Sequence, residues 1–143
     1  MQRHKGFTLV ELVVVVMILG ILAAVAAPKL LTTSSTANEN GLKQTLAVIR
    51  DAIERHAAEH GGRLPGDGGD EGDFKTDIAP YLRGSFPKCP VAQEDASVRY
   101  TTGSGAITGA DTHSWAYNYT TGQFICDSTD FTKSEPTVKY DAW

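Results

Sequence analysis

The sequence predicts an α+β fold in which one long amino-terminal helix packs against a small antiparallel β-sheet. An apolar run over Phe7–Ala27 and a later apolar stripe at helical spacing predict the helix. Alternating aromatic and small residues near the carboxyl terminus predict the strands. We therefore divide the 143 residues into four parts: 1–6, an apolar helix over 7–27, an amphipathic helix over 28–60 and a β-rich domain over 61–143.

The apolar run is long enough to cross a membrane. At about 1.5 Å per residue, Phe7–Ala27 reaches roughly 30 Å, the thickness of a bilayer's hydrocarbon core. Arg3 and Lys5 precede the run, so the positive-inside bias keeps the amino terminus in the cytoplasm and exports the residues after Pro28. Glu11 is the one ionisable residue in the run. A carboxylate costs about 2.5–3.5 kcal/mol at the centre of a membrane helix and less towards its end, so we expect Glu11 to have a function.

Two ordinary interpretations of this segment leave Glu11 unexplained. A secretory signal peptide, cut near Ala24-Val25-Ala26, would release a soluble domain. A plain single-pass anchor would retain the chain in the membrane. Neither interpretation needs a carboxylate at this position.

The stretch RHKGFTLVE, Arg3–Glu11, resembles the leader and mature start of type IV prepilins and of type II secretion pseudopilins. The resemblance implies that residues 1–6 are a leader peptide, that prepilin peptidase cleaves after Gly6, and that Phe7 is N-methylated. It also implies that Phe7 and Glu11 act in subunit assembly, with Glu11 paired to the amino terminus of a neighbouring subunit. A buried carboxylate is tolerated when it is paired, so this contact would set the register between subunits.

The same resemblance implies a pilin-like fold and a set of partners. The chain would polymerise with other pilin-like subunits after contact with the peptidase and an inner-membrane assembly platform. Before assembly it would cross the bacterial inner membrane once, with its exported domain in the periplasm, or at the cell surface once assembled. Ala52–Gly66 resembles the end of the helix in major pseudopilins, although His56 replaces the usual tyrosine.

We therefore expect a structural subunit rather than an enzyme, nearest the pseudopilins of type II secretion. The alternatives are a type IV pilus subunit, for adhesion, motility or DNA uptake, and a secreted soluble domain. The net charge of −4 argues against a nucleic-acid partner. HAAEH, His56–His60, matches the zinc-protease pattern H-x-x-E-H, with Glu59 as the base. We interpret this short match as a coincidence at a helix end, because the short chain offers no obvious third ligand.

The helix after the membrane run has its own signals. Pro28 predicts a kink or a locally melted segment, and Thr32–Gly41 is poor in helix-forming residues. Periodicity then returns, and Gly61-Gly62 is expected to end the helix. The apolar stripe consists of Leu42, Leu46, Ile49, Ile53 and Ala57.

The domain after the helix is predicted in less detail. We expect a solvated loop over Gly61–Phe74, then a short helical turn and a proline-containing loop over Asp77–Val91. Strands are predicted at Ser97–Thr102, Ser114–Tyr119 and Gln123–Cys126, with a last one within Thr137–Trp143. Trp115, Tyr117 and Tyr119 should share one face of the sheet.

Two cysteines lie in the exported part. Cys89 and Cys126 would most simply form a disulfide in an oxidising compartment, worth up to about 4 kcal/mol, the alternative being two separate buried thiols. No cofactor is expected. The resemblance offers calcium as a possible ligand, for which Asp127 and Asp130 are the candidate residues.

Overall fold

The computed structural model describes residues 6–93 and 95–143. Within it the chain forms two units, an amino-terminal unit up to Ser35 and a head domain over Thr36–Trp143. The predictions for residues 1–5 of the leader lie outside the described residues.

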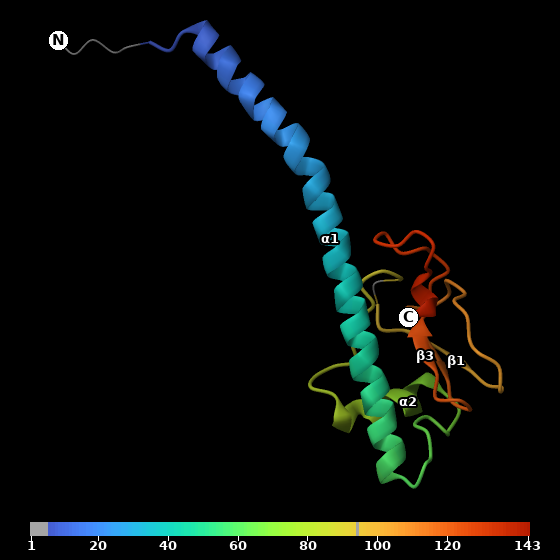
Figure 1. Ribbon diagram of the computed structural model, residues 1–143. Coiled ribbons are helices and arrows are strands. Elements are labelled where there is room, and N and C mark those ends of the chain that lie inside the picture. Colours follow the sequence, from blue (N-terminus) through green and yellow to red (C-terminus); the bar gives the residue numbers. More distant parts are fainter. Residues whose placement is uncertain (1–5, 94) are drawn as a thin grey trace. The chain divides into compact units, whose positions relative to one another are not determined.

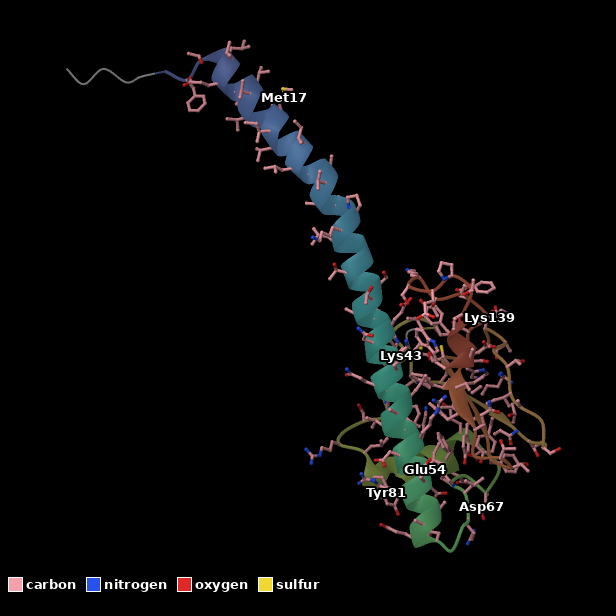
Figure 2. The ribbon with its side chains drawn as sticks, in the orientation of Figure 1. Met17, Lys43, Glu54, Asp67, Tyr81 and Lys139 are labelled. Atoms are coloured by element: carbon pink, nitrogen blue, oxygen red, sulfur yellow. The ribbon has the colours of Figure 1, made fainter. Side chains whose placement is uncertain are left out.

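Helix α1, Leu9–Glu59, contributes to both units and confirms the long helix. From Leu9 to Leu30 its side chains are exposed, and they project outward around Met17 (Figure 2). Among the described residues, α1 is the one helix long and apolar enough to cross a membrane, with a mean hydropathy of 2.9 in its most apolar window. The length and composition therefore fit the predicted membrane span.

Pro28 lies inside α1, and the helix continues through it and on through Asn40 and Gly41. The expectation of a melted segment was therefore wrong, while the kink stays a prediction. Proline removes one backbone hydrogen bond, and the turns on either side keep theirs. One turn later, the Thr33 hydroxyl donates to the Lys29 carbonyl at 2.8 Å.

The head-domain part of α1 buries one face and ends as predicted. Gly61 and Gly62 have φ values of 67° and 92°, which favour glycine. The Gly62 amide donates to the Ala57 carbonyl at 2.7 Å, the hydrogen bond of a Schellman cap. Ala57 itself is half-buried. The buried apolar residues of this face are Leu42, Leu46, Ile49, Ala52 and Ile53.

A second helix, α2, occupies Glu71–Ile78 and continues into the 3-10 turn η1, Ala79–Tyr81. The solvated loop predicted up to Phe74 was therefore wrong from Glu71 onward. The side chain of Asp70 caps the helix by accepting from the Asp73 amide at 2.9 Å. Phe74 and Ile78, four residues apart, are both buried. A cap and two apolar anchors thus form a helix within an acidic, glycine-rich stretch.

The sheet has three strands in the order β1-β2-β3. They are β1 (Val98–Thr101), β2 (Trp115–Asn118) and β3 (Phe124–Cys126), close to the predicted positions. The hairpin β2–β3 is antiparallel, as expected, but β1 pairs with β2 in parallel. Residues 102–114 cause the difference, because they carry the chain back along the sheet instead of turning at its end.

The last predicted strand is absent from the described residues. An isolated bridge between Phe131 and Lys139 and a 3-10 turn, η2 (Tyr140–Ala142), take its place. We call the segment 131–139 the carboxyl-terminal loop.

Both faces of the sheet are buried. Trp115 and Tyr117 join the core that α1 and α2 complete, and Tyr119 packs at its edge, so the shared face is confirmed. Figure 1 shows the sheet and α2 beside the later half of α1. On the opposite face, Ala116 and Ile125 are also buried. Residues 102–113, called the covering loop, are hydrogen-bonded to side chains that include Asn118, Gln123 and Asp127.

Candidate functional site

The candidate site is the start of α1, where Thr8 and Glu11 bond reciprocally. The Glu11 amide donates to the Thr8 hydroxyl oxygen at 3.2 Å. In return, the Thr8 amide and hydroxyl donate to Glu11 Oε2 at 2.9 and 2.8 Å. This arrangement is a capping box, in which Thr8 is the N-cap and Glu11 the third helical residue.

The capping box explains how a carboxylate is held within the apolar run. It satisfies amide groups at the helix start, which have no partner within the helix. The helix dipole also favours a negative charge at this end. Glu11 thus has a local structural task besides the assembly role that the sequence predicts. The pattern T-x-x-E, Thr8–Glu11, would have shown this from the sequence.

The predicted cleavage bond precedes the box. Gly6, Phe7 and Thr8 lie outside regular structure, and α1 begins at Leu9. Phe7 is 78% exposed, and the space around the Gly6 α-carbon is open. An exposed, unwound bond is the kind that peptidases cut most readily. The structure therefore places Gly6, Phe7 and Glu11 within one short segment, and it adds Thr8 to the predicted site.

Asp127, a candidate calcium ligand, is instead the acceptor for a buried ring of donors. Arg99 Nε and Nη2 donate to its Oδ1 at 3.0 and 2.7 Å, and so does the Ala110 amide at 2.9 Å. Oδ2 accepts from the Thr112 amide and hydroxyl and from the His113 amide, at 3.3, 3.0 and 3.0 Å. Burial raises the pKa of Asp127, but the Arg99 and backbone hydrogen bonds outweigh it and hold the pKa below its usual value.

The hydrogen-bond donors around Asp127 do not fit a calcium ion. Calcium needs oxygen atoms with free lone pairs, whereas both oxygens of Asp127 already face N–H and O–H groups. Asp130, the other candidate, has an exposed side chain. Asp127 is better described as the residue that fixes the covering loop.

Cys89 and Cys126 lie together in the core, as the sequence predicts. Their sulfur atoms are 3.6 Å apart and are not bonded, whereas a disulfide bond is about 2.05 Å long. In the structure both cysteines are free thiols, and the disulfide stays a prediction. The hydrogen bond to Cys89 and burial raise the pKa of the Cys126 thiol.

The histidines of HAAEH have structural partners. The rings of His56 and His60 stack, with centroids 4.1 Å apart. His56 Nδ1 lies 3.2 Å from the Arg63 carbonyl oxygen. Glu59, which would be the base of a protease, accepts a hydrogen bond from the Tyr81 hydroxyl at 2.6 Å. These contacts join the end of α1 to the loop after it and to the 3-10 turn η1.

The fold and the site together define a class of protein: a membrane-anchored subunit of the pilin kind. Its features are an apolar helix with a capped glutamate in its first turn, a Gly-Phe bond just before that helix, and a small α+β head after it. The family model of the prokaryotic N-terminal methylation motif matches residues 1–27. The type IV major fimbrial protein FimA of Dichelobacter nodosus is 31% identical in an alignment that covers 94% of this chain and 94% of that protein. The chain therefore belongs to the type IV pilin-like family.

Other relatives match chiefly over a part of their length. Prepilin peptidase-dependent protein D of Escherichia coli (strain K12) is 40% identical over 72 residues, 50% of this chain and 49% of that protein. The type II secretion system core protein G of Klebsiella pneumoniae is 33% identical over 60 residues, 42% of this chain and 43% of that protein. The match thus spans about half the length of these two relatives. No solved structure matches this chain significantly. The relatives are structural subunits and not enzymes.

Proposed function

We propose that this chain is a filament subunit that is cleaved after Gly6, N-methylated on Phe7 and polymerised outside the cytoplasm. The observation that carries the proposal is the capped Glu11, one turn beyond an exposed Gly6–Phe7 bond at the start of an apolar helix. Prepilin peptidase and an inner-membrane assembly platform are the partners that this processing requires. The chain would cross the inner membrane once, with its amino terminus in the cytoplasm and its head domain exported.

Cleavage would create a positive charge beside the capping box. The new ammonium group on Phe7 would lie next to Thr8, whose amide and hydroxyl already orient the Glu11 carboxylate. Both of these bonds end on Oε2, so Oε1 is available to the ammonium group of a neighbouring subunit. Pairing lowers the cost of a charge in an apolar core, and removing one partner of such a pair typically costs about 3–5 kcal/mol.

The relatives support two different kinds of filament, which one experiment can distinguish. The 94% coverage of the Dichelobacter nodosus fimbrial protein favours a type IV pilus at the cell surface. The match to the Klebsiella pneumoniae secretion protein supports a periplasmic pseudopilus of type II secretion, the use that the sequence favoured. Deleting the gene separates them: a pilus subunit's loss removes surface fibres, whereas a pseudopilin's loss leaves secreted proteins inside the cell.

The first test of the proposal is the intact mass and amino-terminal sequence of the protein from its host's membranes. We expect a chain that begins at methylated Phe7. A chain that begins near Ala27 would overturn the proposal, because it would indicate a conventional signal peptide and a released domain.

The role of Glu11 has its own test. We expect Glu11→Ala to be processed and to stay in the membrane but to be lost from fibres, because the neighbour's ammonium group loses its partner. Val10→Ala, a change at the preceding exposed position, is the matched control and should enter fibres normally. A normal fibre yield with Glu11→Ala would refute the assembly role.

A further inference from the structure

Two large apolar side chains stand out on the head domain. Among its described residues, Val48 and Phe131 are the large apolar side chains that are exposed, each at 54%. Single exposed apolar residues are common and need no explanation by themselves. These two are notable for their settings, since one lies in a groove and the other projects from a fixed loop.

Val48 lies in a groove between α1 and residues 81–87. The groove consists of two adjoining hollows of about 440 and 360 Å³, which share Val48 and Pro87. Leu82 lines one hollow and Thr45 the other. A cavity of about 150 Å³ already holds a benzene molecule, so an aromatic ring fits easily. Asp51 and Arg83 give the groove a charged rim.

Phe131 projects from the carboxyl-terminal loop, which is held firmly at several points. Phe131 forms a bridge with Lys139, whose Nζ lies 5.6 Å from the centre of the phenyl ring. The Thr132 amide donates to the Val138 carbonyl at 2.8 Å. The Lys133 amide donates to Oε1 of the buried Glu39 at 2.5 Å. Because these contacts already hold the backbone of the loop, the loop needs little further ordering when Phe131 binds.

The loop and the groove lie on opposite sides of α1. Glu39, which holds the loop, and Val48, which lines the groove, are nine residues apart. At about 3.6 residues per turn, nine residues make two and a half turns, so the two side chains point in opposite directions. Figure 2 agrees, because Lys139 of the loop and Tyr81 of the groove lie on opposite sides of the α1 ribbon. Phe131 therefore cannot fill the groove of its own chain.

We propose that Phe131 of one copy of this chain inserts into the Val48 groove of the next copy. Two different complementary patches on one molecule make a head-to-tail contact, which propagates into an open fibre when the rotation does not close. An apolar anchor with a charged rim is also the usual anatomy of an interface hot spot. The inference rests on the proposed filament function and names a contact between head domains, separate from the Phe7–Glu11 contact.

The test uses mixed fibres from cells that express two variants, Phe131→Cys and Val48→Cys. After mild oxidation of intact fibres, mass spectrometry should find a disulfide-linked peptide pair that joins positions 131 and 48. Ala47→Cys replaces Val48→Cys in the control, because Ala47 is exposed but lies one position round the helix, outside the groove. We expect at least about tenfold less cross-linking with this control.

The outcomes separate the two proposals. Fibres that form without the 131–48 cross-link, or with as much of it in the control, overturn the inference and leave the filament function intact. A cross-link from position 131 to a different protein overturns the assignment to a second copy. Where the variants make no fibres, hydroxyl-radical footprinting of wild-type fibres decides. Oxidation of Phe131 should fall at least about fivefold relative to the monomer in detergent, and unchanged oxidation refutes the contact.

Discussion

Replacing Asp127 by asparagine tests whether this buried carboxylate fixes the head domain. The substitution preserves the size of the side chain but turns one acceptor oxygen into an NH₂ donor. Asp127 is fully buried, and each of its oxygens accepts three hydrogen bonds. The asparagine would lose up to three of these bonds and would leave the charge of Arg99 without its partner.

The magnitude follows from the exposure of the two groups. Removing one partner of a buried ion pair costs about 3–5 kcal/mol. The Arg99 side chain keeps 23% of its surface exposed, so water recovers part of that loss. We therefore expect a loss of about 3 kcal/mol in the free energy of unfolding. With a urea dependence of about 1–3 kcal/mol per molar, the midpoint falls by roughly 1–3 M.

The assay is urea unfolding of the full chain in detergent micelles, followed by the fluorescence of the buried Trp115. Asp130→Asn is the matched control, because Asp130 is exposed and its change should stay within about 0.5 kcal/mol. A midpoint for Asp127→Asn that equals that of the control would refute the structural role of the carboxylate.

The same variant has a defined pH dependence. The pKa of Asp127 is lower in the folded chain than in the unfolded chain, so its ionisation stabilises the fold above the unfolded pKa of about 3.9. That stabilisation is lost as the pH falls through the folded pKa. The difference between wild type and Asp127→Asn should thus be largest near neutral pH and should shrink progressively below about pH 4.

Three further predictions concern other contacts. Oxidised protein should give a Cys89–Cys126 peptide in non-reducing mass mapping, because the sulfurs are 3.6 Å apart; two free thiols after export would exclude the bond. Glu39→Ala should free the carboxyl-terminal loop and speed tryptic cleavage at Lys133, because the Lys133 amide loses its acceptor. Glu39→Gln keeps an acceptor oxygen and should leave the cleavage rate unchanged. Equal cleavage rates for the two variants would contradict the role of Glu39 in holding the loop. Thr8→Val should shift amide exchange at the start of α1 by the equivalent of about 1 kcal/mol, and unchanged exchange would argue against the capping box.

Residue spacing alone predicted the elements with strong periodicity. The apolar run, the stripe from Leu42 to Ile53, and the alternation around Trp115 all appear as helix or strand at nearly the expected positions. The cap at Thr8 was not predicted but could have been, because a capping box is defined by just four consecutive residues.

Other features depend on contacts that no local pattern encodes. The parallel pairing of β1 with β2 depends on how residues 102–114 return across the sheet, and Asp127 lies 28 positions from its partner Arg99. Glu39 has no local signal for burial, because the groups that surround it come from the far end of the chain. Helix α2 was not predicted, because Phe74 and Ile78 are the two buried apolar residues in a mainly acidic and polar stretch, which is too few to show a helical period.

The covering loop is attached to the sheet mainly through its own main chain. Asn118 donates to the Gly103 carbonyl, Gln123 accepts from the Ile107 amide, and Asp127 accepts from the Ala110 amide. The side chains that make these bonds belong to the sheet and its end, while the loop supplies peptide groups that every residue except proline carries in full. Loop positions that supply just an amide, such as Ile107 and Ala110, can therefore change side chain and keep these bonds. Thr112, which also donates its hydroxyl to Asp127, and Gly109, whose α-carbon has no room for a Cβ beside Ser128, do not have this freedom. The outer surface of the head domain can thus vary in sequence at such positions while the sheet and its hydrogen bonds stay the same.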